Sequence, residues 1–271
     1  MLTFLPTPIG NLEDITLRVL EALRNVDILL CEDTRVTKRL IALLIERSLL
    51  PHKTYKYFSL HSHNHEEFFS KTDLDFFCQN IAYVSDAGMP CISDPGIELV
   101  RFLQKNNLPY DAFGGTTALT LAITLSGMVE KEFIFLGFLA HKIKEKEEFL
   151  RKYLSQKIPF ILYESPHRLL ETLKIVSAIN ENCEVFLAKE LTKKYQRTFK
   201  GNIKEILEDI KEKEIKGEWV IVLQGKENEN LVLSENEIYM LDIPPKIKAK
   251  ILAKLHNKPV SDFYNSLCEK N

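Results

Sequence analysis

The stretch that decides the fold is Tyr83–Gly96, "YVSDAGMPCISDPG", and it continues an apolar run that begins at Ile81. The run has the length and character of a buried strand. Two Ser-Asp pairs, two glycines and two prolines follow within a dozen residues. A plain turn needs only one glycine or one proline. The stretch therefore predicts a rigid, carboxylate-bearing loop at the end of a strand, which is where ligands bind in open parallel sheets.

Five further loops with the same character follow other expected strands. They are Pro6–Asn11, Cys31–Arg35, Phe113–Ala118, Tyr163–Arg168 and Ala188–Arg197. Glycine lets a ligand approach the backbone closely, and proline fixes the backbone in place. Amides at the helix starts after Gly96 and Gly115 could hold a carboxylate, and Asp86 or Asp94 could accept from an amine. Each loop alone is more often only a turn or a helix cap than a ligand contact, but six at one sheet edge predict a ligand site.

The first half of the chain alternates strand and helix patterns. Strands are expected at 2–5, 27–31, 55–60, 81–84 and near Tyr110. Helices are expected after Asp14 as a cap, and at 39–45, 65–78 and 96–105. Alternation with continuously apolar strands predicts a parallel sheet that helices cover on both faces.

The second half adds a strand pair to this alternation. Helices are expected at 118–125, 142–154 and after Pro166, and strands at 133–136, 158–163, 184–189, 194–199 and 219–223. The runs 184–189 and 194–199 are close enough to form a hairpin, and 219–223 is expected to close the sheet. The polar stretch 225–230, "GKENEN", is interpreted as a linker to a small basic helical tail. We therefore expect α/β domains at 1–113 and 114–230 and a helical domain at 231–271.

Composition limits the class of protein. The 271 residues are 45% hydrophobic, and the formal net charge is −2. Such a chain can bury a large core, but nucleic-acid contacts would have to come from local patches. The five cysteines contain no C-x-x-C pair, and the "HSHNH" run at 61–65 lacks a flanking carboxylate or cysteine triad. No metal site, disulfide, signal peptide or membrane span is predicted, so we expect a cytoplasmic protein.

Five segments in the same order resemble a known family. They are "TPIGNLEDITLRVLEAL" (7–23), "CEDTR" (31–35), "VSDAGMPCISDPG" (84–96), "YESPHRL" (163–169) and "AKELTK" (188–193). Together they resemble the ribosomal RNA small subunit methyltransferase I family, which belongs to the tetrapyrrole methylase fold group. The resemblance runs from Leu2 to Gly225 and continues weakly through the tail. One such segment would mean little, but five in register form a specific pattern.

The resemblance implies a fold, a cofactor and partners. It implies two α/β domains of the tetrapyrrole methylase type with a cofactor cleft between them, followed here by the helical tail. It implies an S-adenosylmethionine-dependent enzyme that methylates the ribose 2′-hydroxyl of a cytidine in the decoding region of 16S ribosomal RNA. The implied partners are that RNA or the small ribosomal subunit, and a second copy of the chain in a homodimer.

The resemblance also implies which loops hold the cofactor. The 85–96 loop is similar to the family's cofactor loop, with Asp86, Ala87, Gly88 and Pro90 near the methionine and sulfonium end. The full expected set is Pro8, Asp86, Ala87, Gly88, Pro90, Ser93, Asp94, Thr117, Ala118, Tyr163 and Glu164. The chain departs from the family where Gly114–Thr117, "GGTT", replaces Pro-Gly-Pro-Ser, and where Met89 replaces a threonine. Without the two prolines we expect a looser loop.

A ribose hydroxyl is a poor nucleophile near neutral pH, so a proton acceptor is expected. The candidates are Glu32, Asp33, His63, Glu164, His167 and Glu190. Glu190 and Asp33 are preferred because basic residues that could hold RNA phosphates surround each of them. The expected RNA-binding residues are Arg35, Arg168, Lys189, Lys193, Lys194, Arg197, Lys246 and Lys250. A solvated helix face is the commoner explanation for lysine-rich helices.

Two other functions fit parts of the sequence. An enzyme of the same fold could methylate a small molecule such as a tetrapyrrole, although the basic tail argues against this. A non-catalytic RNA-binding protein of ribosome assembly could have lost the cofactor, and the altered "GGTT" loop favours that alternative. Calorimetry with S-adenosylmethionine and a methylation assay on small-subunit RNA separate the three functions.

Overall fold

The computed structural model describes residues 1–94, 96–211, 215–225 and 235–268. The chain separates into two compact units, Met1–Lys226 and Glu227–Asn271. The expected domain boundary at 230/231 and the "GKENEN" linker beyond Gly225 lie outside the described residues. The expected division at 113/114 falls within the first unit, between its two sheets, and stays a prediction.

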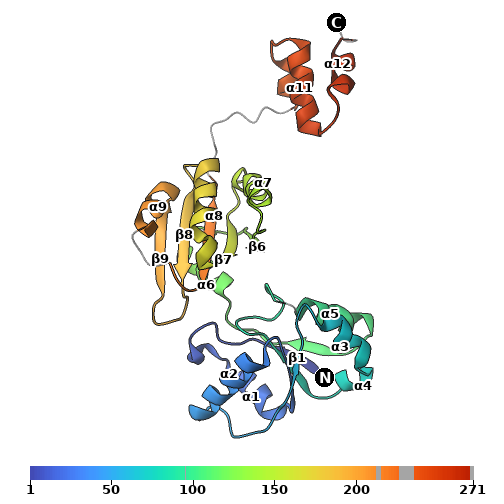
Figure 1. Cartoon of the computed structure of the whole chain (residues 1–271), viewed down its shortest axis with the longest axis vertical. Helices are drawn as coiled ribbons and strands as arrows, with labels where there is room; N and C mark the ends of the chain where they lie inside the picture. The colour runs from blue at the N-terminus through green and yellow to red at the C-terminus, as the bar shows by residue number, and fades with distance from the viewer. Residues whose placement is uncertain (95, 212–214, 226–234, 269–271) are drawn as a thin grey trace. The chain divides into compact units, whose positions relative to one another are not determined.

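The first sheet is parallel throughout its five strands (Figure 1). Its strands are β1 (Leu2–Leu5), β2 (Ile28–Cys31), β3 (Lys56–Ser59), β4 (Ile81–Val84) and β5 (Tyr110–Ala112), in the order β3-β2-β4-β1-β5. Every residue of β1, β2 and β4 is buried, as expected for strands that helices cover on both faces. The prediction of a parallel sheet for this half is confirmed.

Helices cover both faces of this sheet. The helices α1 (Leu17–Asn25) and α2 (Thr34–Glu46) pack on one face. The helices α3 (His65–Lys71), α4 (Leu74–Phe77) and α5 (Gly96–Lys105) pack on the other, where phenylalanines of α3 and α4 contact one another. Because all five strands run the same way, their loops to the following helices emerge at one edge of the sheet.

The second sheet is mixed. Its strands are β6 (Ile134–Phe138), β7 (Phe160–Glu164), β8 (Glu184–Lys189), β9 (Arg197–Asn202) and β10 (Trp219–Gln224), in the order β6-β7-β10-β8-β9. The hairpin of β8 and β9 is confirmed. The prediction that the 219–223 strand closes the sheet is wrong, because β10 lies in the middle and pairs antiparallel with both β7 and β8.

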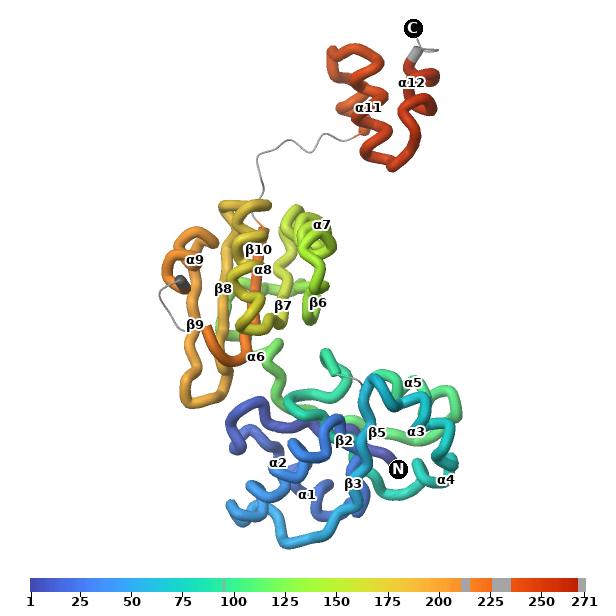
Figure 2. The backbone as a smooth tube through the Cα atoms, in the orientation of Figure 1, coloured from blue at the N-terminus to red at the C-terminus, as the bar shows by residue number. Residues whose placement is uncertain are grey.

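One helix covers one face of the second sheet and three cover the other (Figure 2). The helix α6 (Ala118–Ser126) packs on the first face, and α7 (Ile143–Leu154), α8 (Pro166–Ile179) and α9 (Ile203–Lys211) pack on the second. Both α6 and α8 begin directly after an expected loop. Thr117 caps α6 by accepting from the Thr120 amide at 3.0 Å, and Pro166 occupies the first turn of α8.

Several expected element ends are corrected. The cap of α1 is Thr16, which accepts from the Val19 amide, whereas Asp14 lies in the 3₁₀ turn η1 (Leu12–Asp14). The expected helix at 65–78 is broken between Lys71 and Leu74 into α3 and α4. The helix expected at 39–45 begins at Thr34, and the strand expected at 194–199 lies at 197–202.

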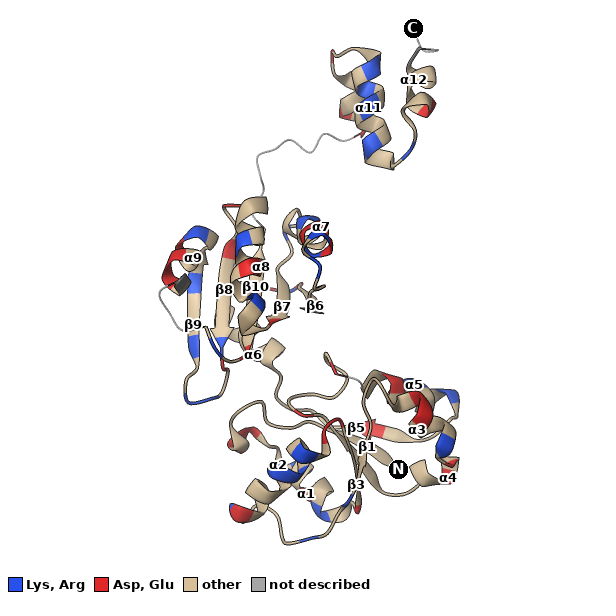
Figure 3. Ribbon diagram, viewed as in Figure 1, with Lys and Arg blue, Asp and Glu red and all other residues tan. Residues whose placement is uncertain are grey.

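The second unit contains the helices α10 (Glu235–Met240), α11 (Pro245–His256) and α12 (Val260–Cys268). Asn257, in the left-handed conformation, ends α11, and α12 begins three residues later. Figure 3 shows basic residues distributed along the length of α11. Among the described residues, no helix combines the length and apolar character needed to cross a membrane.

Candidate active site

A cavity of about 430 Å³ in the first unit receives residues from all six predicted loops. The 85–96 loop contributes most of one wall, and Tyr163, Glu164 and Ala188 come from the second sheet. Strands β7 and β8 both run antiparallel to β10, so they are parallel to each other and their carboxyl ends share one edge. The rule that ligands bind beyond the carboxyl ends of strands therefore locates the cavity correctly.

Hydrogen bonds and backbone conformation hold the 85–96 loop in a fixed shape. Gly88 exchanges two backbone hydrogen bonds with Thr7, at 2.9 and 3.1 Å, and its carbonyl accepts from the Ser85 hydroxyl. Cys91 and Ser93 adopt positive φ angles of 69° and 63°. Such angles are uncommon in non-glycine residues, and the surrounding structure must impose them. The loop is therefore a rigid frame.

Burial, and repulsion from neighbouring acids, raise the pKa of three carboxylates of the cavity wall. Burial raises the pKa of Glu32, and repulsion from Asp86 and Asp94 raises it further. Burial also raises the pKa of Asp86 and of Asp94, against hydrogen bonds from loop amides that lower it. A cation in the cavity would relieve this repulsion and favour the ionised acids.

Asp86 and Asp94 also fix the loops that carry them. The Asp33 amide donates to Asp86 Oδ1 at 3.0 Å, which joins the loops after β2 and β4. The amides of Cys91 and Gly96 donate to Asp94 Oδ1 at 2.7 and 2.8 Å. Asp94 Oδ2 is buried without a hydrogen-bond partner in the described structure. A buried acceptor left in this state is suited to a ligand that donates.

The second sheet contributes a buried glutamate and a tyrosine. Glu164 is 2% exposed, and its carboxylate accepts from the Thr172 hydroxyl at 2.7 Å and from the Ser165 amide at 2.9 Å. Arg168 Nε lies 3.4 Å from the same carboxylate. The Tyr163 hydroxyl accepts from the Leu119 amide at the start of α6. These contacts leave both side chains little freedom to move.

Nine of the eleven expected cofactor residues line the cavity, and Pro8 and Pro90 do not. The nine are Asp86, Ala87, Gly88, Ser93, Asp94, Thr117, Ala118, Tyr163 and Glu164. Several apolar wall residues were not predicted from the sequence, including Ile9, Met89 and Phe138. Glu218 and Trp219 were not predicted either, because they precede or begin β10, whose amino end reaches this edge. Only an antiparallel assignment of β10 would have revealed them.

The two preferred proton acceptors lie beside the cavity rather than in its wall. Asp33 caps α2, and its hydrogen bonds with Arg35 lower the pKa of its carboxyl to about 2. Burial raises the pKa of Glu190, but the Glu218 amide and Lys193 outweigh this effect and lower it. Of the other candidates, Glu32 and Glu164 line the cavity, whereas His63 and His167 do not.

The expected RNA-binding residues fall into three groups. Arg168 donates to the carbonyls of Leu139 and Ala140 and is mostly buried, so it supports the fold. Lys193 pairs with Glu190 and Glu218 at 3.0 Å, and Arg35 pairs with Asp33. The remaining group consists of Lys189, Lys194 and Arg197 around the 188–197 loop and of Lys246 and Lys250 on α11.

A family model described as Tetrapyrrole (Corrin/Porphyrin) Methylases matches residues 1–207. The chain is 44% identical to the ribosomal RNA small subunit methyltransferase I of Helicobacter pylori strain 26695, with all of both chains covered. It is 40% identical to the protein of that name from Bacillus subtilis strain 168, over 85% of this chain and 77% of that one.

Solved structures share the fold at low identity. A cobalt precorrin-4 methyltransferase matches with a TM-score of 0.59 at 15% identity, over 82% of this chain and 94% of that one. A uroporphyrin-III C-methyl transferase from Thermus thermophilus, complexed with S-adenyl homocysteine, matches with a TM-score of 0.57 at 15% identity, over 82% and 96%. Fold, motifs and sequence identity agree, and the chain belongs to the ribosomal RNA small subunit methyltransferase I family of methyltransferases, within the tetrapyrrole methylases.

Proposed function

We propose that the chain uses S-adenosylmethionine to methylate the ribose 2′-hydroxyl of a cytidine in the decoding region of 16S ribosomal RNA. The observation that carries the proposal is an acidic cluster inside a cavity of otherwise mainly apolar lining. The names of the relatives supply the RNA substrate, and the resemblance of the motifs supplies the ribose hydroxyl.

The wall residues fit the cofactor. S-adenosylmethionine carries a sulfonium and an ammonium, which suit Glu32, Asp86 and Asp94. Its adenine suits the apolar and aromatic part of the wall that includes Tyr163 and Phe138. Ligand cavities typically measure about 300–1,000 Å³, and this one measures about 430 Å³. Pro8 and Pro90 would act through the backbone that they fix.

S-adenosylmethionine, when bound, supplies a methyl group that its sulfonium already activates, so the chain need not hold a metal. The chain's own residues then align two reactants and exclude water. A side chain in or beside the wall must also accept the ribose proton or orient the hydroxyl. Glu190 and Asp33 remain proposals for this role, and Glu32 joins them because it lines the cavity and has a raised pKa.

RNA phosphates are proposed to contact the basic residues outside the cavity. The candidates are Lys189, Lys193, Lys194 and Arg197 of the first unit and Lys246 and Lys250 of α11. Phosphate contacts fix the register of an RNA without reading its sequence. A second copy of the chain remains a proposal that sedimentation analysis can test.

Methyl transfer to small-subunit RNA tests the function directly. The protein should transfer labelled methyl from S-adenosylmethionine to one nucleotide, and that position should resist alkaline hydrolysis because its 2′-hydroxyl is blocked. Asp86→Ala should lose the activity, and Asp111→Ala should keep it, since Asp111 is an exposed acid paired with Arg18. Label in a base or in a tetrapyrrole, or calorimetry without cofactor binding, would contradict the proposal.

A further inference from the structure

A second cavity, of about 420 Å³, lies on the α9 face of the second sheet. We call it the base hollow and define it by Lys189, Tyr195, Arg197, Phe199, Lys216 and Trp219. Its wall comes from the end of β8, the start of β9 and the start of β10, with Ile210 of α9 beside them. The hollow thus combines three cations with three aromatic rings.

The aromatic rings of the base hollow range from buried to largely exposed. Trp219 is 3% exposed, and the Phe199 ring stacks on it with centroids 6.0 Å apart and planes inclined by 27°. Tyr195 is 70% exposed and belongs to neither of the apolar clusters on the two faces of the second sheet. Aromatic faces of this kind bind unpaired bases of RNA, because every base presents a flat π-face.

The indole of Trp219 has an unused hydrogen-bond donor. Its Nε1 is buried, and no partner accepts from it within the described residues. An indole N–H can only donate, and leaving such a group buried and unpaired is costly. Tryptophan packed only for stability usually satisfies this donor. The indole beside the base hollow therefore retains an unsatisfied donor.

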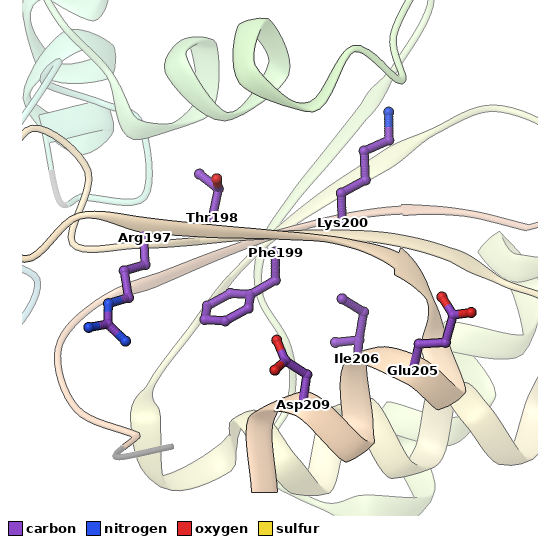
Figure 4. Close-up of a pocket in the computed structure, with 7 residues that line it drawn as sticks. All are labelled: Arg197, Thr198, Phe199, Lys200, Glu205, Ile206 and Asp209. Atoms are coloured by element: carbon purple, nitrogen blue, oxygen red, sulfur yellow. The ribbon is translucent and has the colours of Figure 1, made fainter. Parts of the chain in front are cut away.

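Cations surround the rings, and Glu190, the one carboxylate among the described residues of the wall, is already engaged. Arg197 and Phe199 point to the α9 side of β9 in Figure 4, while Thr198 and Lys200 point to the other side. Lys189 Nζ lies 5.6 Å from the Trp219 ring centroid. Glu190 also lines the hollow, but it accepts from the Glu218 amide at 2.9 Å and pairs with Lys193.

Trp219 lines both the base hollow and the cavity of the candidate active site. The two cavities therefore share a residue, which suits consecutive nucleotides of one strand. We propose that the base hollow binds an unpaired nucleobase of the RNA that neighbours the methylated nucleotide. Tyr195 and Phe199 stack on the base, and Arg197 and Lys216 hold its phosphate. This inference rests on the proposed function and identifies the class of substrate, single-stranded RNA, at its site.

The chain's single tryptophan gives a direct readout, because Trp219 is the only one of 271 residues to be tryptophan. The protein is first saturated with S-adenosylhomocysteine and then titrated with a cytidine hexanucleotide or with a hexamer of abasic riboses. The base-bearing RNA should quench the fluorescence and bind about tenfold more tightly than the abasic one. Equal affinity for the two, or no change in fluorescence, would overturn the proposal.

Variants test the same site by activity. Tyr195→Ala should raise the KM for RNA about tenfold at unchanged kcat, and Tyr195→Phe should restore it, because stacking needs the ring alone. Arg197→Ala with Lys216→Ala should flatten the salt dependence of RNA binding. Lys204→Ala controls for the loss of a cation elsewhere, since Lys204 lies beyond the other end of β9 and pairs with Glu181. An alanine variant of Tyr195 with the parent KM would contradict the inference.

The two proposals fail differently. If the parent protein transfers no methyl to small-subunit RNA, the proposed function fails, and the fluorescence titration alone decides the base hollow. If methyl transfer is normal but the abasic RNA binds as tightly as the cytidine RNA, the base hollow falls and the proposed function stands.

Discussion

Asp86 joins two loops and lines the cavity with the same carboxylate. Asp86→Asn keeps an oxygen that can accept from the Asp33 amide but removes the charge. We expect the variant to be at least as stable as the parent and to bind S-adenosylmethionine about 10- to 100-fold more weakly, because hydrogen bonds to charged groups contribute about 1.5–3 kcal/mol. Calorimetry measures the affinity and urea unfolding the stability. Asp111→Asn is the control, and parent affinity in Asp86→Asn would remove this residue from the cation site.

The pH dependence of cofactor binding follows from the same charges. In the free protein, burial raises the pKa of Asp86, Asp94 and Glu32, and a bound cation favours their ionised forms. Affinity should therefore fall as pH falls through these raised values, above the 3.8 and 4.5 of ordinary carboxyls. The stability of the cofactor-free protein should change in the opposite direction. Because burial raises the pKa of these acids in the folded state, the free energy of unfolding should rise as pH falls and they become protonated. Calorimetric titration with S-adenosylmethionine at pH 4–8 measures this dependence. The affinity of Asp86→Asn should change less with pH than that of the parent.

The proton acceptor can be distinguished by its environment. A general base works best with a pKa near the working pH. Burial raises the pKa of Glu32, whereas its contacts lower that of Glu190 and Arg35 lowers that of Asp33 to about 2. Glu32→Gln should therefore lower kcat at least about 100-fold with little change in the KM for RNA. If Glu190→Gln loses kcat and Glu32→Gln does not, the original preference for Glu190 is restored.

At the scale of elements, the 113–118 loop contains two adjacent glycines with different surroundings. A Cβ on Gly115 would lie 2.3 Å from the Pro6 ring, while a Cβ on Gly114 would meet nothing within 4 Å. Gly115→Ala should therefore destabilise the fold and disturb the start of α6. Gly114→Ala should stabilise it by about 0.4–1 kcal/mol, since it restricts the unfolded chain. Urea unfolding measures the free energy of unfolding of both variants. Equal changes in the two would show that Pro6 moves aside to accommodate the new Cβ.

The local pattern of apolar residues predicted most strands and several helices. The position of β10 in its sheet was not predicted, because it depends on pairing between segments that are distant in sequence. The apolar runs at 2–5 and 81–84 and the helix at 96–105 lie where expected, because each is set by its own residues. The position of β10 depends on its partners Phe160–Glu164 and Glu184–Lys189, which are distant in sequence. Glu190 likewise meets Gly217, where a Cβ would lie 2.5 Å from its Cδ. Such contacts cannot be inferred from spacing, so the site residues of β10 were missed.

At the scale of the whole molecule, the second unit carries exposed positive charge on a helix that is not part of the first unit. Lys246, Lys250 and Lys254 are exposed on α11, and the two units are separately compact. Phosphate contacts contribute affinity without sequence specificity, and each contact adds about 0.7 to the log–log salt slope for single strands. We therefore expect the second unit to strengthen RNA binding and to leave the chemistry to the first.

Ending the chain after Lys226 tests this division. The shortened protein should fold, bind S-adenosylmethionine with parent affinity, and show a raised KM for small-subunit RNA with a flatter salt dependence. Lys246→Ala with Lys250→Ala in the full chain should reproduce part of both effects, because two cations are removed while the helices stay. Ala substitution of Lys56, an exposed lysine of β3, controls for the loss of a surface lysine outside α11. A shortened protein with parent KM and parent salt slope would mean that α11 meets solvent rather than RNA. Loss of cofactor affinity on shortening would mean that the first unit needs the second to form its cavity.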